Sequence, residues 1–293
     1  MYKYSNCLVC GNAKFDIVFN AKDYTVSQEV FQIVSCSSCG FTFTDPRPEN
    51  DKLGPYYHSD AYISHSDTSK GLINKLYKEV RKITLRSKSK LLKPYLDKGY
   101  LLDIGAGTGA FLNYAFIQGI KCIGVEPDEA ARSQANKLYK LELKPESYLS
   151  EMATGSCDAI SMWHVLEHVP QLHNRILELK RLLSPKGIIA IAVPNHKSFD
   201  AQHYKSFWGA YDVPRHLYHF DKESITKLFG DQDLELVGIK GMPFDSFYVS
   251  LLSEKYKTGG MNWFKSFYIG LRSYLTSGKD NWSSQIYLFA HKV

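Results

Sequence analysis

The sequence has no uninterrupted run of about 20 apolar residues, which is the length that a membrane-spanning helix requires. Its first residues also lack the basic and then apolar pattern of a secretory signal. With 44% hydrophobic and 23% charged residues, the composition excludes the disordered and collagen-like classes. We therefore expect a cytoplasmic globular protein, and 293 residues suffice for one enzyme domain and a small accessory module.

A broad excess of positive charge is also absent. The net charge of +6 is confined to residues 51–98, which carry 11 Lys and Arg against 5 Asp and Glu, whereas residues 1–50 sum to −1 and residues 99–293 to +1. A dedicated nucleic-acid binder carries a wider basic surface. The surplus therefore indicates a local contact with an anion.

Cysteine is scarce outside the first fifty residues. Four of the six cysteines form two C-x-x-C pairs, Cys7 with Cys10 and Cys36 with Cys39, and a glycine follows each pair. Four thiolates complete a tetrahedral shell, which predicts a structural zinc with no position open for substrate. We expect residues 1–48 to form a zinc ribbon, with a β-hairpin between the pairs and a further strand at 41–43.

Two disulfides or a redox pair are the alternatives to zinc. Disulfides need an oxidising compartment that nothing in the sequence indicates, and a redox motif would not occur twice at ribbon spacing. Zinc is therefore the favoured prediction. Cys122 and Cys157 fall in predicted strands, where we expect buried, unreactive thiols.

Residues 49–98 are expected to form a linker and a basic amphipathic helix. From 70 to 96, apolar residues recur at helical spacing on one face, and the other face carries Lys75, Lys78, Lys82 and Arg86. A surface helix with a solvated basic face is the simpler interpretation. The alternative is a contact with a phosphate-bearing substrate, a membrane surface or RNA.

The region after Tyr100 has the pattern of a nucleotide-binding βαβ unit. A strand at 100–104 leads into the glycine loop at 105–109, then a helix, and then a strand at 121–125 that ends at Glu126. Glycines let the backbone approach a ligand, and a carboxylate at this strand end accepts hydrogen bonds from ribose hydroxyls. The loop also fits a dinucleotide fingerprint, but Asp103 would repel a pyrophosphate and suits a cationic amine.

Residues 99–195 resemble the class I S-adenosylmethionine-dependent methyltransferases. The resemblance rests on three blocks in order, LDIGAGTG at 102–109, CDAISMWHVLEHVP at 157–170 and LLSPKGIIAIAVPN at 182–195. It implies an α/β fold, a Rossmann-like, mostly parallel sheet with an antiparallel last strand, and S-adenosylmethionine as cofactor. The cofactor-binding residues that it implies are Asp103, Gly105, Ala106, Gly107, Gly109, Glu126, Pro127, Trp163 and His164.

Residues 99–293 would then form the methyltransferase domain, with substrate insertions at 196–222 and 241–283. The first insertion contains WGAYDVPRHLYHF at 208–220, which lies beyond the carboxyl end of a predicted strand, where α/β folds bind ligands. Clustered titratable groups there indicate a site. We expect a catalytic base among His216, His219 and His164, orientation by Asp212 or Glu167, a substrate anion at Arg215, and a substrate contact at Tyr218.

Some neighbouring residues are expected to have structural roles. We expect His168 to serve in a turn, Phe220 to fill the core and Asp221 to cap a helix. The 208–220 block and the four-cysteine module together resemble a methyltransferase subgroup that includes sugar C-methyltransferases.

The last hundred residues are expected to complete the sheet, with strands at 234–240 and 285–290, the latter antiparallel. Between them, residues 259–275 carry too many aromatic side chains for a solvated loop. We expect a helix that covers the active site or a dimer interface. The alternative is peripheral membrane contact through 261–275.

The sequence thus predicts an S-adenosylmethionine-dependent methyltransferase acting on a small or carrier-linked metabolite, such as a sugar, glycan or lipid-linked acceptor, because the variable segments are compact and aromatic. The main alternative is an RNA-modifying methyltransferase that holds phosphates with the ribbon and the basic helix. A cofactor-binding module without catalysis and an NAD-dependent oxidoreductase are the remaining alternatives.

Overall fold

The computed structural model describes residues 1–57, 72–96 and 99–292, apart from the side chains of 72–77. Its strands are β1 (Phe15–Lys22), β2 (Val30–Cys36), β3 (Thr42–Thr44), β4 (Leu101–Ile104), β5 (Cys122–Val125), β6 (Cys157–Trp163), β7 (Leu183–Pro194), β8 (Tyr218–His219), β9 (Leu234–Gly241) and β10 (Ser284–His291). Its α-helices are α2 (Leu72–Leu92), α3 (Ala110–Ile117), α4 (Glu129–Tyr139), α5 (Tyr148–Glu151), α6 (Leu172–Leu182), α7 (Phe199–Tyr204), α8 (Lys222–Gly230), α9 (Asp245–Thr258) and α10 (Trp263–Thr276). Within the described ranges, none of these helices has the length and apolarity that crossing a membrane takes.

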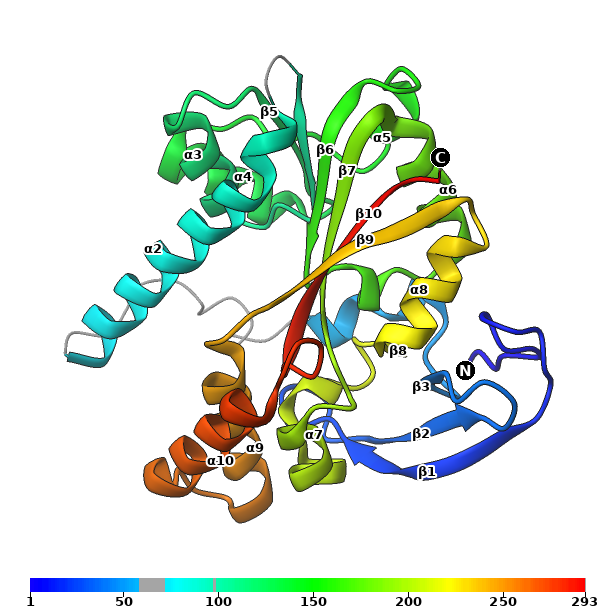
Figure 1. Cartoon of the computed structure of the whole chain (residues 1–293). Coiled ribbons are helices and arrows are strands. Elements are labelled where there is room, and N and C mark those ends of the chain that lie inside the picture. Colours follow the sequence, from blue (N-terminus) through cyan, green and yellow to red (C-terminus); the bar gives the residue numbers. More distant parts are fainter. Residues whose placement is uncertain (58–71, 97–98, 293) are drawn as a thin grey trace.

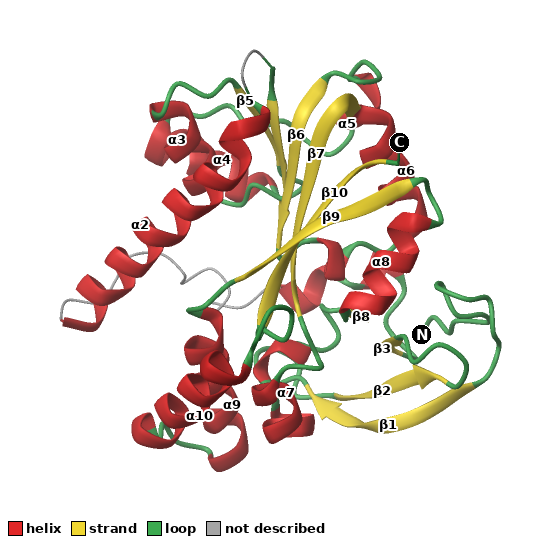
Figure 2. Cartoon of the chain, in the orientation of Figure 1, coloured by secondary structure: helices red, strands yellow, loops and turns green. Residues whose placement is uncertain are grey.

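A six-stranded sheet in the order β5-β4-β6-β7-β10-β9 forms the centre of the molecule (Figures 1 and 2). β4 is parallel to β5 and β6, and β6 to β7, whereas β10 is antiparallel to both of its neighbours. This confirms the predicted parallel sheet with an antiparallel last strand. β7 begins at Leu183, which lies opposite Cys157 of β6.

Alternation along the strands gives the sheet two apolar faces. In β4, Leu101 belongs to the cluster with Phe111 of α3, whereas Leu102 belongs to the cluster with Ile176 of α6 and Ile225 of α8. Successive side chains of a strand point to opposite faces, so each face is covered by its own helices. The predicted N-cap is confirmed, since the Asp221 side chain accepts a hydrogen bond from the amide of Ser224 at the start of α8.

The ribbon sheet includes a strand from the second half of the chain. Its order is β1-β2-β3-β8, and β8 pairs with β3 through Thr42 with His219 and Phe43 with Tyr218. Phe41 and Phe220 are buried in a cluster that continues into the residues beneath the central sheet. The ribbon therefore packs on the core of the larger domain and is not a separate module joined to it only by a linker.

The ribbon sheet, α7, α9 and α10 all lie at the lower end of the molecule in Figure 1, the end at which β7 finishes. The insertion expected at 241–283 contains α9, which the sequence pattern did not reveal, as well as α10, and the two helices pack against each other. Segments outside the βαβ unit thus lie beyond the carboxyl end of β7, on the side of the sheet where α/β folds bind ligands.

Candidate active site and zinc ribbon

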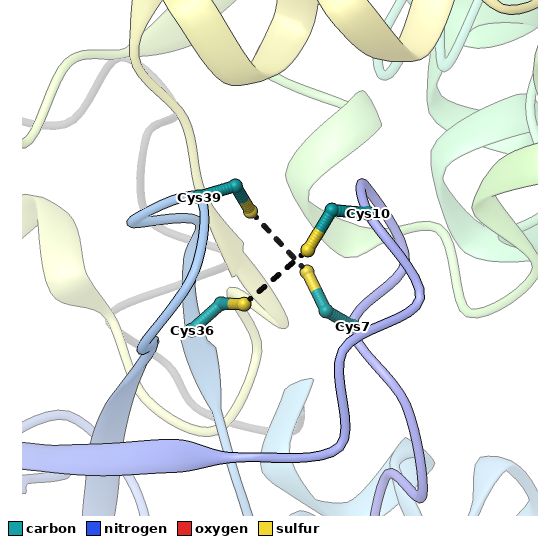
Figure 3. Close-up of side chains that lie close together, drawn as sticks. All are labelled: Cys7, Cys10, Cys36 and Cys39. Carbon is teal, nitrogen blue, oxygen red and sulfur yellow. Dashed lines mark hydrogen bonds between the residues drawn. The ribbon is translucent and has the colours of Figure 1, made fainter.

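The four predicted zinc ligands lie together where the two cysteine turns meet (Figure 3). The Sγ–Sγ distances are 3.6 Å between Cys7 and Cys39 and 3.5 Å between Cys10 and Cys36, and all four atoms lie within 4.8 Å of one another. A disulfide would require about 2.05 Å, whereas Zn–S bonds of about 2.3 Å place tetrahedral sulfurs about 3.8 Å apart. The thiols therefore fit a structural zinc, which remains a prediction.

The glycine loop between β4 and α3 has the backbone that its sequence requires. Gly105 and Gly107 have φ angles of +72° and +55°, which disfavour other residues. A Cβ on Gly105 would lie 2.4 Å from a methyl carbon of Val165, whereas a Cβ on Gly107 would meet nothing within 4 Å. The loop is thus packed against the protein at Gly105 and open at Gly107, where a ligand can approach the backbone.

Two carboxylates flank this loop. Glu126, at the end of β5, accepts hydrogen bonds from the amides of Gly107 (2.7 Å) and Asp128 (3.0 Å). Asp103 is 1% exposed and accepts a 2.6 Å hydrogen bond from the Ser161 hydroxyl. Burial raises the pKa of Glu126 and raises that of Asp103 to about 7, which the Ser161 hydrogen bond and the Lys88 ammonium only partly offset.

Lys88 is a residue of this site that the sequence pattern did not single out. It lies on α2, where we expected solvated lysines, but its Nζ is 4.3 Å from the centre of the Trp163 ring. Burial lowers the pKa of Lys88 to about 8, against the attraction of Asp103 and Asp245. No spacing rule links residue 88 to the end of β6; only the packing of α2 against the sheet does.

Four titratable side chains gather beside the end of β6. His164 has a φ of +58°, which costs about 1 to 3 kcal/mol and is typical of functional sites. Its Nε2 lies 3.2 Å from Asp245 Oδ2 and its Nδ1 lies 3.5 Å from Glu167 Oε1. His216 Nε2 lies 4.0 Å from the same Glu167 oxygen, and the rings of His168 and His216 are 4.6 Å apart. We call His164, Glu167, His168 and His216 the histidine cluster.

The structure joins the loop that carries His216 to the ribbon through Arg215. Arg215 has no exposed surface, and its Nη2 lies 2.9 Å from Asp23 Oδ1 and 2.6 Å from Asp212 Oδ1. It also donates to the Tyr56 carbonyl and the Thr25 hydroxyl. The donors of Arg215 are therefore directed at protein groups, and a positioning role fits it better than the substrate contact that we expected from the sequence.

Strand β3 also holds this loop directly. The hydroxyl of Thr44 donates to the His216 carbonyl at 2.9 Å, and the amide of Thr44 donates to the Leu217 carbonyl at 3.0 Å. On the other side, the Leu217 amide donates to the Glu167 carbonyl at 2.8 Å. The ribbon and the turn after β6 thus fix the backbone of His216 between them.

The Asp23→Asn variant is expected to be about 3 kcal/mol less stable, because it leaves the buried Arg215 with one of its two carboxylates. Burial would raise the pKa of Asp23, but Arg215 and backbone amides hold it at about 2, below its ordinary 3.8. The deficit should therefore persist above pH 3.8 and shrink as the pH falls towards 2. Urea unfolding measures it, with the exposed Asp16→Asn as control; equal stability of both variants at neutral pH would contradict this account.

His219 and Tyr218 lie in the ribbon interface. The His219 Nε2 is 3.1 Å from the Thr44 hydroxyl, and its ring packs edge-on against Tyr211. The Tyr218 hydroxyl donates to the Pro170 carbonyl, and its ring packs against Phe41. Their positions fit structural roles, whereas His168, which we expected to be structural, lies inside the histidine cluster.

Comparison with known proteins adds independent findings. Residues 75–239 match a protein family described as a methyltransferase domain. An uncharacterized methyltransferase of Alkaliphilus oremlandii (strain OhILAs) is 30% identical over 111 residues, which are 37% of this chain and 50% of that protein. The aligned region thus spans half the length of that relative.

Solved structures resemble the chain at low sequence identity. A SAM-dependent methyltransferase of Archaeoglobus fulgidus superposes with a TM-score of 0.50 at 16% identity, covering 75% of this chain and 99% of that one. One from Thermotoga maritima gives 0.51 at 19%, covering 75% and 96%. A geranyl diphosphate methyltransferase in complex with SAM gives 0.52 at 17%, covering 80% and 95%. These likenesses show that the fold is shared.

Proposed function

The chain belongs to the methyltransferase domain family, and we propose that it transfers a methyl group from S-adenosylmethionine to a small or carrier-linked acceptor. The observation that carries the proposal is the position of the histidine cluster. Trp163 ends the strand that pairs with β4 and His164 follows it, so the cluster begins beside the glycine loop and its two carboxylates. A site for the methyl donor and a set of proton-exchanging groups therefore adjoin each other.

The residues around the loop fit this cofactor. Gly107 leaves its backbone open, and carboxylates stand at both neighbouring strand ends. Glu126 retains acceptor capacity for ribose hydroxyls beyond its two amides. Asp103 suits an ammonium group, while Ala106, Gly109 and Pro127 complete the loop and the turn after β5. The cofactor would supply a methyl group on an electrophilic sulfonium.

The histidine cluster would activate the acceptor. His216 Nδ1 lies 2.8 Å from the Ala210 carbonyl oxygen. Because a carbonyl oxygen can only accept, Nδ1 carries the proton and donates, and Nε2 keeps a lone pair. The His216 side chain is 11% exposed, so water has little access to it. Arg215 and Thr44 hold the loop, and His216 Nε2 lies 4.0 Å from both Glu167 Oε1 and Asp212 Oδ2. We therefore propose His216 as the first of the three predicted histidines to act on the acceptor.

Binding of S-adenosylhomocysteine tests the cofactor assignment. It is expected to raise the melting temperature of the protein, whereas NAD is not, because a ligand that binds only the folded state stabilises it. Asp103→Asn should weaken that binding about 10- to 100-fold through loss of a charged hydrogen-bond acceptor. Asp158→Asn is a matched control. Asp158 also accepts a hydrogen bond from a serine, Ser184, at 2.6 Å, but it lies near the start of β6, whereas Ser161, the partner of Asp103, lies nearer its end. Stabilisation by NAD alone would contradict the proposal.

A lipid-linked acceptor is favoured by the outer face of α10. Phe264 is 91% exposed and Leu275 70% exposed, whereas Ile269 and Gly270 face inward. The exposed Lys255 and Lys257 of the preceding helix α9 complement an anionic surface. We propose that this face contacts a bilayer containing anionic lipid.

Co-sedimentation with vesicles tests this contact. The protein should sediment with phosphatidylcholine vesicles containing phosphatidylserine, and Phe264→Ser with Leu275→Ser should reduce the bound fraction several-fold because the apolar face is lost. Phe116→Ser with Ile117→Ser is the control, since these residues of α3 are 64% and 69% exposed. Equal binding of both double variants would argue against α10 as the contact.

A further inference from the structure

Glu167, His168 and His216 offer one carboxylate oxygen and two imidazole nitrogens, and these ligand atoms lie within 4.8 Å of one another. We propose that these three residues bind a divalent metal cation, separate from the zinc predicted for the ribbon, and that this cation binds the acceptor. The inference deepens the proposed function and rests on it for the role of the cation, although binding of the cation can be measured without methyl transfer.

The two imidazoles are oriented as metal ligands usually are. His216 Nδ1 donates to the Ala210 carbonyl at 2.8 Å, and His168 Nδ1 donates to the Arg215 carbonyl at 3.0 Å, with the Tyr57 hydroxyl at 3.1 Å. Each ring therefore keeps Nε2 as a free lone pair. Hydrogen bonds from the second ring nitrogen to a carbonyl fix the tautomer and orientation of metal-bound histidines.

The carboxylate supplies an independent observation. Glu167 is fully buried, and neither of its oxygens has a hydrogen-bond partner among the described residues. Its nearest positive partners are ring nitrogens at 3.5 Å (His164) and 4.0 Å (His216), both longer than a good hydrogen bond. These long contacts to imidazoles compensate a buried carboxylate less well than a cation bound directly to its oxygens would. A metal ion would satisfy both oxygens and the two lone pairs together.

Backbone hydrogen bonds hold the three metal-binding residues in place in the absence of a bound cation. Glu167 and His168 belong to the 3-10 turn Leu166–His168 that follows β6, and the Glu167 carbonyl accepts from the Leu217 amide. His216 is fixed from the ribbon side by Thr44. The three residues therefore come from two segments, and hydrogen bonds fix the backbone of each segment. This arrangement favours a preformed binding site over a random approach of flexible side chains.

Three protein ligands leave coordination positions for substrate, unlike the closed four-cysteine site. Two imidazoles and a carboxylate suit Mn²⁺ or Zn²⁺, and a cation bound this way lowers the pKa of a coordinated hydroxyl. The acceptor class is therefore an alcohol, with a pair of neighbouring sugar hydroxyls able to fill two positions. With its Nε2 on the cation, His216 acts on the acceptor through the cation and not as the proton acceptor. The hydroxyl proton passes to water, the oxygen bonds to the methyl carbon, and the electron pair of the broken C–S bond stays on sulfur.

Titration with Mn²⁺, followed by the loss of the free-ion electron paramagnetic resonance signal, tests the site in protein that carries one zinc ion per chain, which the four thiols would hold. Mn²⁺ is a poor match for the ribbon thiols, so it reports on the second site. We expect one Mn²⁺ per chain, and Glu167→Gln and His168→Gln should each weaken its affinity at least about tenfold. Asp245→Asn, which alters a carboxylate beside His164 but outside the three ligands, should retain Mn²⁺ binding.

Equal Mn²⁺ affinity in the wild type and Glu167→Gln, or no Mn²⁺ binding by the wild type, would overturn the proposal. Thermal melting with S-adenosylhomocysteine is recorded on the same samples and shows that each variant is folded. Cofactor binding without Mn²⁺ binding would overturn the cation site alone. Mn²⁺ binding without cofactor binding would overturn the proposed function and leave the cation site standing.

Discussion

The double variant Cys36→Ser with Cys39→Ser is expected to lose its zinc and to lower methyl-transfer turnover about 100-fold, although neither cysteine lies near the cofactor loop. Structural zinc sites contribute about 10 kcal/mol or more to the folding of small modules. Without the metal, β3 would no longer hold Thr44 against the His216 backbone, and Asp23 would no longer hold Arg215. A misplacement of about 1 Å at a reacting group can cost about 100-fold in rate.

Zinc content by atomic emission and turnover with S-adenosylmethionine measure the two parts of this prediction. Cys122→Ser is the control, because Cys122 is half-buried in β5 and lies outside the cysteine cluster. Chelation should act in the same direction as the double variant, since Cys10 and Cys39 are exposed. Full turnover in zinc-free protein would show that the ribbon does not position the loop.

The His216→Ala variant is expected to lower turnover by about 100- to 10,000-fold while S-adenosylhomocysteine affinity stays unchanged. This range is typical for removal of a group that assists proton transfer, and loss of a metal ligand would act in the same direction. Cofactor affinity should stay because Asp103, Gly107 and Glu126 make no hydrogen bond to His216 among the described residues. Single-turnover kinetics separate the chemical step from binding.

Two further histidines sharpen this test. His173→Ala is the control for loss of an imidazole, because His173 lies on α6. His219→Ala was expected from the sequence to cut turnover as well. The structure places His219 against Thr44 and Tyr211. We therefore expect His219→Ala to lower the stability of the protein more than the rate of the chemical step. Full turnover in His216→Ala would place acceptor activation on His164 or on a group outside the cluster.

The sequence by itself determined the βαβ unit and its order. Glycines with positive φ can be recognised by residue type, and a parallel strand buried on both faces shows as an apolar run, as in β4 and β7. Asp103 and Glu126 could be placed because Asp103 lies near the end of such a strand and Glu126 follows one. The strand pairing of the ribbon could be anticipated for the same local reasons, since β1, β2 and β3 are adjacent in sequence.

Only the tertiary structure decided which polar residues lie together. Asp23 and Arg215 are 192 positions apart, and Lys88 reaches Trp163 because α2 packs on the sheet. Local spacing placed Arg215, His216, Tyr218 and His219 in one block, yet the alternating directions of β8 and the turn before it send them to different neighbours. A local pattern specifies backbone conformation and the face of an element, whereas contacts between distant segments depend on how whole elements pack. The contacts of the ribbon with the His216 backbone and the packing of His168 against His216 therefore had no signal in the sequence.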